Sequence, residues 1–172
     1  QKLVEELFEL AKLETHQIKL RNEAFQIAEL VQDVALKIKP SADFSLVTIT
    51  IDQPEKLSPI NGDIGMIERV LTNLLENAIA HTPEKGQVNI SIVQKDEELL
   101  LTVSDTGSGI AQEDLPHIFE RFYRADKSRD RRTPGTGLGL AITKEIVGLH
   151  SGRIEADSPE GKGAVFRIFL PL

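Results

Sequence analysis

The 172-residue chain has an ordinary globular composition, with 40% hydrophobic and 27% charged residues, and its length suits one domain with a short extra element. Its net charge of −7 argues against a nucleic-acid surface, which needs a concentration of Lys and Arg, but leaves room for a small anionic ligand in a local positive pocket. The absence of cysteine excludes disulfides and thiolate metal sites, and no apolar run approaches the ~20 residues of a membrane-spanning helix.

The first predicted element is an amphipathic helix over residues 3–12. Leu3, Leu7 and Leu10 recur at three- and four-residue spacing, with charged residues between them. A helix this short needs a partner to be stable. That partner is either the chain's own domain or a helical bundle of which this helix is the tail. Because the leucine pattern of this helix is already under way at the first residue, we favour the bundle. We therefore expect the chain to be a piece of a longer protein.

The other predicted elements, in order, are a polar linker over 15–23, a helix over 27–38, a strand over 46–51, a helix over 63–82, paired strands at 87–94 and 99–105, an irregular stretch over 107–137, a helix over 138–149 and closing strands at 153–157 and 164–170. Pro40 is expected to end the second helix, Asp63 to cap the third, and Gly152 to lie near the end of the fourth. Helices and antiparallel strands in separate runs predict an α+β sandwich and argue against a parallel, doubly wound sheet.

The third helix carries two asparagines one turn apart. Asn73 and Asn77 share one stripe of the helix, and His81 stands a turn further on. A neutral amide oxygen is a suitable ligand for Mg²⁺ that already carries phosphate oxygens and waters. A solvated polar face would give the same pattern, so these residues alone do not decide between the two.

Two glycine-containing turns are candidate binding loops. Asp105 closes a strand and precedes Gly107 and Gly109, so its carboxylate could accept a hydrogen bond from an exocyclic amine such as that of adenine. The competing interpretation is a common Asp-Thr-Gly turn.

Residues 135–142, GTGLGLAI, lead directly into a helix, where exposed backbone N–H groups can bind an anion. Their spacing matches neither the dinucleotide fingerprint nor a P-loop.

Between these loops lies a cationic segment. Residues 121–132 contain six Arg and Lys residues in an otherwise acidic chain. Such a loop could close over phosphates, with Arg124 holding a pair of oxygens and with Phe119 and Phe122 anchoring its entrance. The alternative is a solvated charged loop, since acidic residues are interspersed.

Taken in order, NLLENAIAHTP, DTGSGI, FERFYRAD and GTGLGLAI resemble the N, G1, F and G2 boxes of bacterial two-component sensor histidine kinases. These kinases share an ATP-binding superfamily with gyrase, Hsp90 and MutL. The resemblance covers about residues 24–172 and implies a two-layer, Bergerat-type sandwich, in which helices cover one face of a mixed, mostly antiparallel sheet. It implies the end of a dimerisation helix plus linker over 1–22 and a catalytic domain over 23–172.

The same resemblance implies ATP and Mg²⁺ as cofactors. The implied partners are the kinase's own phosphoacceptor domain, in a homodimeric parent, and the receiver domain of a response regulator. The domain would lie in the cytoplasm, and whether the parent is anchored in the inner membrane is left open.

Residue roles follow by matching positions. The residues implied to bind the cofactor are Asn73, Asn77, Asp105, Gly107, Gly109, Ile110, Phe119, Arg124, Gly135, Thr136, Gly137, Leu138 and Gly139. Asp105 would bind the adenine amine, Asn77 would hold Mg²⁺, and Arg124 would reach the terminal phosphate. Asn77 and Arg124 would be the catalytic residues.

Two features depart from the family pattern. Ala80 stands where these kinases often have Lys or Arg, and no stretch matches the acceptor motif His-Glu-Leu-Arg-Thr-Pro; the neighbours of His16 do not resemble it. The chain is therefore expected to bind Mg·ATP and donate its terminal phosphate to a histidine elsewhere, for relay to a response regulator, without phosphorylating itself.

Three alternatives remain. The first is an ATP-gated ATPase of the gyrase, Hsp90 and MutL type, which places Glu where this chain has Asn73. The others are an anti-sigma-factor serine kinase and a degenerate module that only holds nucleotide. Glu76 is expected to point elsewhere on the helix than Asn77, which counts against the ATPase.

Overall fold

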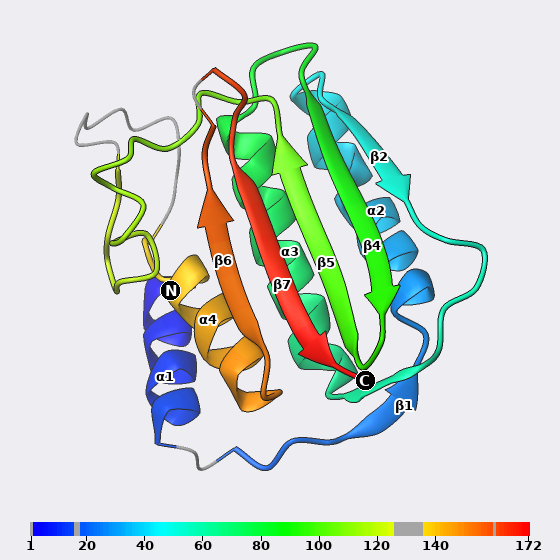
Figure 1. Ribbon diagram of the computed structural model, residues 1–172. Helices are drawn as coiled ribbons and strands as arrows, with labels where there is room; N and C mark the ends of the chain where they lie inside the picture. Colours follow the sequence, from blue (N-terminus) through cyan, green and yellow to red (C-terminus); the bar gives the residue numbers. More distant parts are fainter. Residues whose placement is uncertain (1, 16–17, 126–135, 160) are drawn as a thin grey trace.

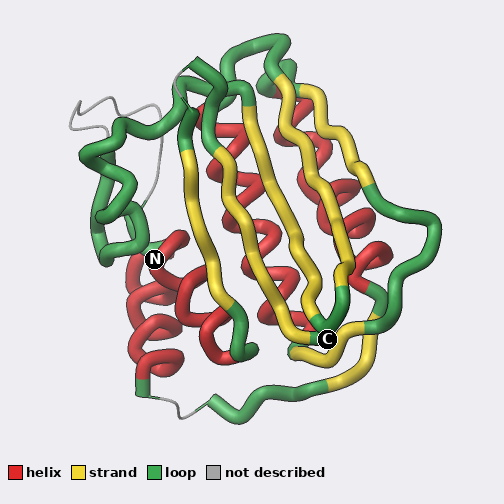
Figure 2. Tube along the Cα trace, viewed as in Figure 1, coloured by secondary structure: helices red, strands yellow, loops and turns green. Residues whose placement is uncertain are grey.

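The computed structural model describes residues 2–15, 18–125, 136–159 and 161–172. Its elements are α1 (Lys2–Glu14), β1 (Glu23–Phe25), α2 (Ile27–Phe44), β2 (Thr48–Asp52), β3 (Ile60–Gly62), α3 (Ile64–His81), β4 (Gln87–Lys95), β5 (Glu98–Asp105), α4 (Gly139–Leu149), β6 (Arg153–Asp157) and β7 (Val165–Pro171). They form a two-layer sandwich in which α2, α3 and α4 lie behind a five-stranded sheet (Figures 1 and 2).

The sheet has the strand order β2-β4-β5-β7-β6. β2 runs parallel to β4, and the other neighbouring strands are antiparallel, which confirms the expected mixed, mostly antiparallel sheet. β4 and β5 form the predicted hairpin, in which Lys95 pairs with Glu98. Asp105, at the end of β5, therefore lies beside Val88 near the start of β4.

The core fills the space between the sheet and the helices. Every second residue is buried in β5, in β7 and in β4 as far as Ile92, as expected for a sheet with one face against helices. Ile67, Leu71 and Leu74 of α3 are at most 1% exposed and form the facing side of this core. Each buried side chain of this size contributes about 1.5–3 kcal/mol. The packing fixes α3 against the sheet, and with it the polar edge that carries Asn73 and Asn77.

The second helix does not end at Pro40, contrary to the sequence prediction. α2 continues to Phe44 because its buried stripe continues through Ile38 and Ala42. Pro40 lies on the exposed side of the helix, as does Leu36, which is 68% exposed. The carbonyl of Leu36 loses its N–H partner to the proline ring but can be hydrated there, so the interruption is tolerated.

Asp63 caps α3 as predicted, since its carboxylate accepts a hydrogen bond from the Met66 amide at 3.2 Å.

β1 and β3 form a small antiparallel sheet that was not predicted from the sequence, because residue 23 fell within the predicted linker. This sheet carries the chain from α1 around to the start of α2 and α3 (Figure 1).

α1 packs against α4 at one edge of the sandwich (Figure 1). Leu10 and Leu13 are each 1% exposed in this contact, whereas Val4 and Phe8 are 69% and 63% exposed. The helix is thus docked on its own domain, and the assignment of residues 1–22 to a separate bundle stays a prediction. Among the helices that the structure describes, none combines the length and hydropathy needed to cross a membrane.

Candidate functional site

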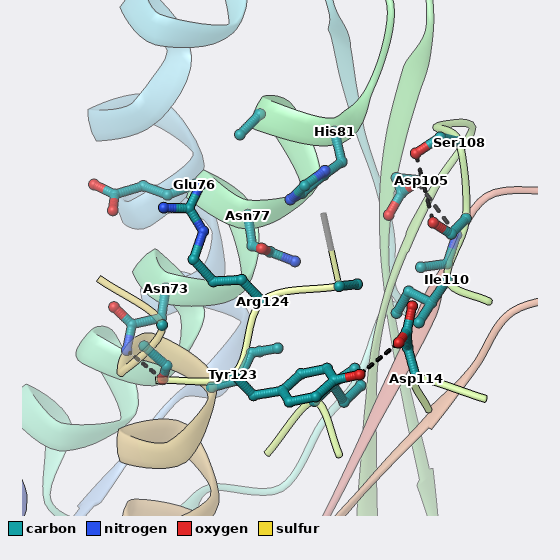
Figure 3. Close-up of a pocket in the computed structure, with 18 of the residues that line it drawn as sticks. Asn73, Glu76, Asn77, His81, Asp105, Ser108, Ile110, Asp114, Tyr123 and Arg124 are labelled. Carbon is teal, nitrogen blue, oxygen red and sulfur yellow. Dashed lines mark hydrogen bonds between the residues drawn. The ribbon is translucent and has the colours of Figure 1, made fainter. Parts of the chain in front are cut away.

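A cavity of about 580 Å³ opens between α3 and the loop that follows β5 (Figure 3). This volume lies within the ~300–1,000 Å³ of typical small-molecule sites. The predicted site residues that line the cavity are Asn73, Asn77, Asp105, Gly109, Ile110, Arg124, Thr136, Gly137 and Gly139. Gly107, Phe119 and Leu138 do not line it, and Gly135 lies outside the described residues. Residues from segments that are far apart in the sequence therefore line the same cavity.

Asn73 and Asn77 lie on one face of α3 but make different contacts. Asn73 is 9% exposed, and its Nδ2 donates hydrogen bonds to the carbonyl of Gly139 at 3.1 Å and to Thr143 Oγ1 at 3.4 Å. The Asn77 carboxamide points into the cavity and has no hydrogen bond to any described residue (Figure 3). Asn73 therefore joins α3 to α4, whereas Asn77 presents its carboxamide to a ligand.

Glu76 also lines the cavity, although it was not among the predicted site residues. It lies three residues after Asn73, and residues at this spacing share one side of a helix. Its side chain extends in a different direction from the Asn77 carboxamide, away from Asp105 (Figure 3). The expectation that Glu76 and Asn77 point to different sides therefore agrees with the structure.

Asp105 faces the cavity from the opposite wall and is 5% exposed. Its Oδ1 accepts hydrogen bonds from the backbone amides of Gly107 at 2.8 Å and Ala164 at 3.2 Å. Its Oδ2 accepts no hydrogen bond from a described residue. The two amides thus fix the orientation of the carboxylate, and one oxygen remains to accept a hydrogen bond from a ligand.

The backbone around Asp105 is closely packed at two glycines. A Cβ on Gly107 would lie 2.3 Å from the His81 carbonyl oxygen, and one on Gly163 would lie 2.0 Å from the Asp105 carbonyl oxygen. Gly107 therefore lies behind the cavity wall, where it allows the loop to approach α3. Gly163 was missed by the sequence analysis, although the neighbouring pair of glycines before the last strand was a signal of close backbone approach.

Ser158 is a second residue that the sequence analysis missed. It is 4% exposed, its Oγ accepts a hydrogen bond from the Ile110 amide at 2.7 Å, and it donates one to the Gly163 carbonyl at 2.8 Å. A lone serine before a proline gives no sequence signal of such a role. Ser158 holds the Asp105 loop against the end of the sheet.

The entrance of the cationic segment is anchored by Phe119 and Tyr123. Phe119 packs edge-on against Phe166, with ring centroids 6.5 Å apart, whereas Phe122 is 55% exposed and is not an anchor. The Tyr123 hydroxyl donates a hydrogen bond to Asp114 Oδ1 at 2.5 Å (Figure 3). This hydrogen bond, with smaller contributions from desolvation and nearby carboxylates, raises the pKa of Tyr123 from 10.0 to about 12. Tyr123 lines the cavity as a neutral phenol.

Arg124 lines the cavity, and its side chain extends toward Glu76 and Asn77 (Figure 3). The middle of the cationic segment, residues 126–135, lies outside the described residues, so the loop predicted to close over phosphates is not described. At the beginning of the segment, Arg121 forms an ion pair with Glu14 of α1.

α4 begins at the cavity with Leu138 as its N-cap and without a side-chain capping hydrogen bond. The first turn of a helix leaves backbone N–H groups without partners, and its positive dipole end favours an anion. Gly139 and Leu140 of this turn line the cavity. The cavity therefore joins a hydrogen-bond acceptor for a base, Asp105, to a helix end suited to phosphate.

The described residues contain no group of three or more His, Cys, Asp or Glu placed to hold a metal ion. A divalent cation in this cavity would take its ligands from phosphate oxygens and water together with few protein atoms. The Asn77 amide oxygen suits such an arrangement, which Mg²⁺ commonly adopts with nucleotides.

Comparison with known proteins places the site in a family. Residues 62–172 match the family model described as histidine kinase-, DNA gyrase B-, and HSP90-like ATPase. The sensor histidine kinase WalK of Bacillus subtilis is 38% identical over 172 residues, which cover 99% of this chain and 28% of that protein. The sensor-like histidine kinase SenX3 of Mycolicibacterium smegmatis is 37% identical over 169 residues, covering 98% of this chain and 44% of SenX3. The chain thus spans less than half the length of these relatives.

Solved structures give the same result. The crystal structure of full-length ShkA in complex with AMPPNP superposes with a TM-score of 0.89 at 29% identity, covering 99% of this chain and 35% of that one. The histidine kinase AdeS of Acinetobacter baumannii superposes with a TM-score of 0.80 at 29% identity, covering 98% of this chain and 76% of that one. Both matches include nearly all of the chain described above.

Proposed function

Because the chain belongs to the family of histidine kinase-, DNA gyrase B- and HSP90-like ATPases, we propose that it binds Mg·ATP and donates the terminal phosphate to a histidine of a separate phosphoacceptor domain. A response regulator would then receive the phosphate from that histidine. The observation that carries the proposal is that Asp105 and the uncapped start of α4 line the same cavity. The parent would be a homodimeric sensor histidine kinase with this domain in the cytoplasm.

The base would bind at the Asp105 wall. Asp105 Oδ1 is held by two backbone amides, so Oδ2 would accept a hydrogen bond from the exocyclic amine of adenine. Ile110, on the same wall, supplies an apolar surface for the ring. The phenol of Tyr123, held by Asp114, closes the cavity on the neighbouring side.

The phosphates would bind toward α4. The N–H groups of its first turn can donate to phosphate oxygens, and Thr136 adds a hydroxyl next to them. Arg124 can bind an oxygen pair through its guanidinium. When bound, Mg²⁺ would neutralise charge that develops on the phosphates, and Asn77 would supply it with one oxygen ligand.

In the transfer step an imidazole nitrogen of the acceptor histidine forms a bond to the terminal phosphorus. The bond from that phosphorus to the bridging oxygen breaks, and the electron pair leaves with ADP. This chain would contribute mainly position and charge stabilisation, since a reacting group misplaced by 1 Å can cost about a hundredfold in rate.

The test is phosphotransfer in trans. The chain is incubated with [γ-³²P]ATP and magnesium, alone and with the helical bundle of the parent that carries the acceptor histidine. We expect acid-labile, alkali-stable label on the bundle only, and none on a bundle whose acceptor histidine is replaced by Gln. Acid-labile label on this chain alone, lost in His16→Gln, would contradict the assignment of the acceptor to another segment.

The same reactions test the alternatives. Glu76 is one of the residues that line the cavity, and a carboxylate in the wall is the observation that favours an ATPase, in which it would activate water. Phosphate release without an acceptor, abolished in Glu76→Gln, would support the ATPase and oppose the kinase. Alkali-labile label on a partner protein would instead indicate a serine kinase. Tight binding without any turnover, even with the bundle present, would indicate a nucleotide-holding module.

A further inference from the structure

Asp114 lies in the cavity wall close to the residues proposed to hold the base. Its backbone amide donates a hydrogen bond to the carbonyl of Ala111 at 2.9 Å, which holds Asp114 in the turn that follows Ile110. Ile110, Ala111 and Asp114 all line the cavity. The carboxylate of Asp114 therefore belongs to the same wall as the apolar surface proposed for the adenine ring.

The backbone of Tyr123 lies on the side of the cavity proposed to hold the phosphates. The amide of the preceding residue, Phe122, donates a hydrogen bond to the Gly137 carbonyl at 2.9 Å. A Cβ on Gly137 would lie 3.1 Å from the Tyr123 carbonyl oxygen, and Gly137 comes two residues before α4. From there the Tyr123 side chain extends across the cavity to Asp114 (Figure 3). The hydrogen bond between them thus connects the phosphate side to the base side.

The ribose of a nucleotide joins the base to the phosphates, so it would occupy the same stretch of the cavity. Its hydroxyls at C2′ and C3′ are donors, and a carboxylate oxygen is a strong acceptor for them. The Tyr123 hydroxyl donates to Asp114 Oδ1 at 2.5 Å, and among the described residues no group donates to Oδ2. Because the pKa of Tyr123 is about 12, the phenol keeps its proton at neutral pH and holds the carboxylate in place.

We propose that Asp114 is a specificity-determining residue that selects ribonucleotides, because its Oδ2 accepts a hydrogen bond from a ribose hydroxyl. Tyr123 is the positioning residue, since its hydrogen bond to Oδ1 fixes the orientation of the carboxylate. The inference rests on the proposed function, because it assumes that the cavity binds ATP with the base at Asp105. Dinucleotide-binding folds use an acidic residue for the same purpose, to bind the ribose 2′-hydroxyl.

The test compares the affinities for ATP and 2′,3′-dideoxy-ATP by calorimetry. The two ligands differ only in the ribose hydroxyls, so the ratio of their dissociation constants measures what those hydroxyls contribute. We expect the unchanged chain to bind ATP roughly 10- to 150-fold more tightly, the range that corresponds to a hydrogen bond to a charged group. The 2′-deoxy and 3′-deoxy analogues then show which hydroxyl is bound.

Asp114→Ala should bring this ratio close to one, because the acceptor is removed. An effect of the substitution on the fold would weaken both ligands alike and cancel in the ratio. In Tyr123→Phe the carboxylate stays but loses its fixed orientation, so the ratio should fall in part. The matched control is Glu113→Ala, which removes a neighbouring, exposed carboxylate that does not line the cavity. Its ratio should equal that of the unchanged chain.

Equal affinity of the unchanged chain for ATP and dideoxy-ATP would overturn the proposal and leave the proposed function intact. A ratio that persists in Asp114→Ala, or one that is lost equally in Glu113→Ala, would also overturn it. Should Asp114→Ala not fold, an unreduced ratio in Tyr123→Phe would have the same consequence. If the unchanged chain bound neither nucleotide, the proposed function itself would fail.

Discussion

Tyr123 and Asp114 are joined by a hydrogen bond of 2.5 Å that lies in the wall of the cavity (Figure 3). The carboxylate accepts the phenolic proton, which stabilises the neutral phenol and raises the pKa of Tyr123 to about 12. Because Tyr123 is the single tyrosine of a chain without tryptophan, its titration can be observed directly.

We expect an ultraviolet titration of the native chain to show one phenol with a pKa of about 12. In the unfolded chain, and in Asp114→Asn, the pKa should fall toward the ordinary value of 10.0. Since folding raises this pKa, the contribution of the hydrogen bond to stability is complete below about pH 10 and is lost as the pH rises through about 12. A native pKa near 10 would show that the hydrogen bond does not persist in solution.

Asp105→Asn should weaken binding of ATP and adenosine without unfolding the domain. The amide oxygen can accept the two hydrogen bonds from Gly107 and Ala164, so the amide nitrogen then faces the cavity. That nitrogen is a donor and cannot accept from the adenine amine. Losing a charge-assisted hydrogen bond of about 1.5–3 kcal/mol corresponds to roughly 10- to 150-fold in affinity. Calorimetry on Asp105→Asn, with exposed Asp33→Asn as control, measures this, and equal affinities would remove Asp105 from the site.

Asn77→Ala should weaken nucleotide binding more with magnesium than without it. Its carboxamide has no hydrogen bond to a described residue, so its removal should leave the thermal midpoint nearly unchanged. The comparison is ATP affinity in magnesium and in EDTA, for both the variant and the unchanged chain. An equal loss in both conditions would contradict a role in holding the metal.

Asn73→Ala should lower stability rather than act only on the ligand. Its side chain is buried and donates to Gly139 and Thr143 across the contact between α3 and α4. We expect a loss of about 1 kcal/mol, because Thr143 Oγ1 continues to donate to the Gly139 carbonyl at 2.9 Å. For a domain of this size that lowers the midpoint of thermal unfolding by about 2–4 °C. An unchanged midpoint would show that this cross-link does not stabilise the fold.

The sequence by itself determined the features that depend on near neighbours along the chain. The stripe of Asn73, Asn77 and His81 follows from helical periodicity, and all three residues line the cavity. Strand alternation predicted the hairpin of β4 and β5, and the cap at Asp63 followed from local hydrogen bonding. In each case one element contains all the groups concerned, so spacing alone is informative.

Only the tertiary structure decided which partners these groups meet. Periodicity shows which face of α3 is polar, but not that Asn73 donates to α4, that Ala164 donates to Asp105, or that α1 brings Glu6 to Thr136. It also could not show that α2 continues past Pro40, because that depends on which side of the helix is hydrated. Contacts between distant segments arise from how the layers pack, and a side chain's own neighbours in sequence do not contain that information.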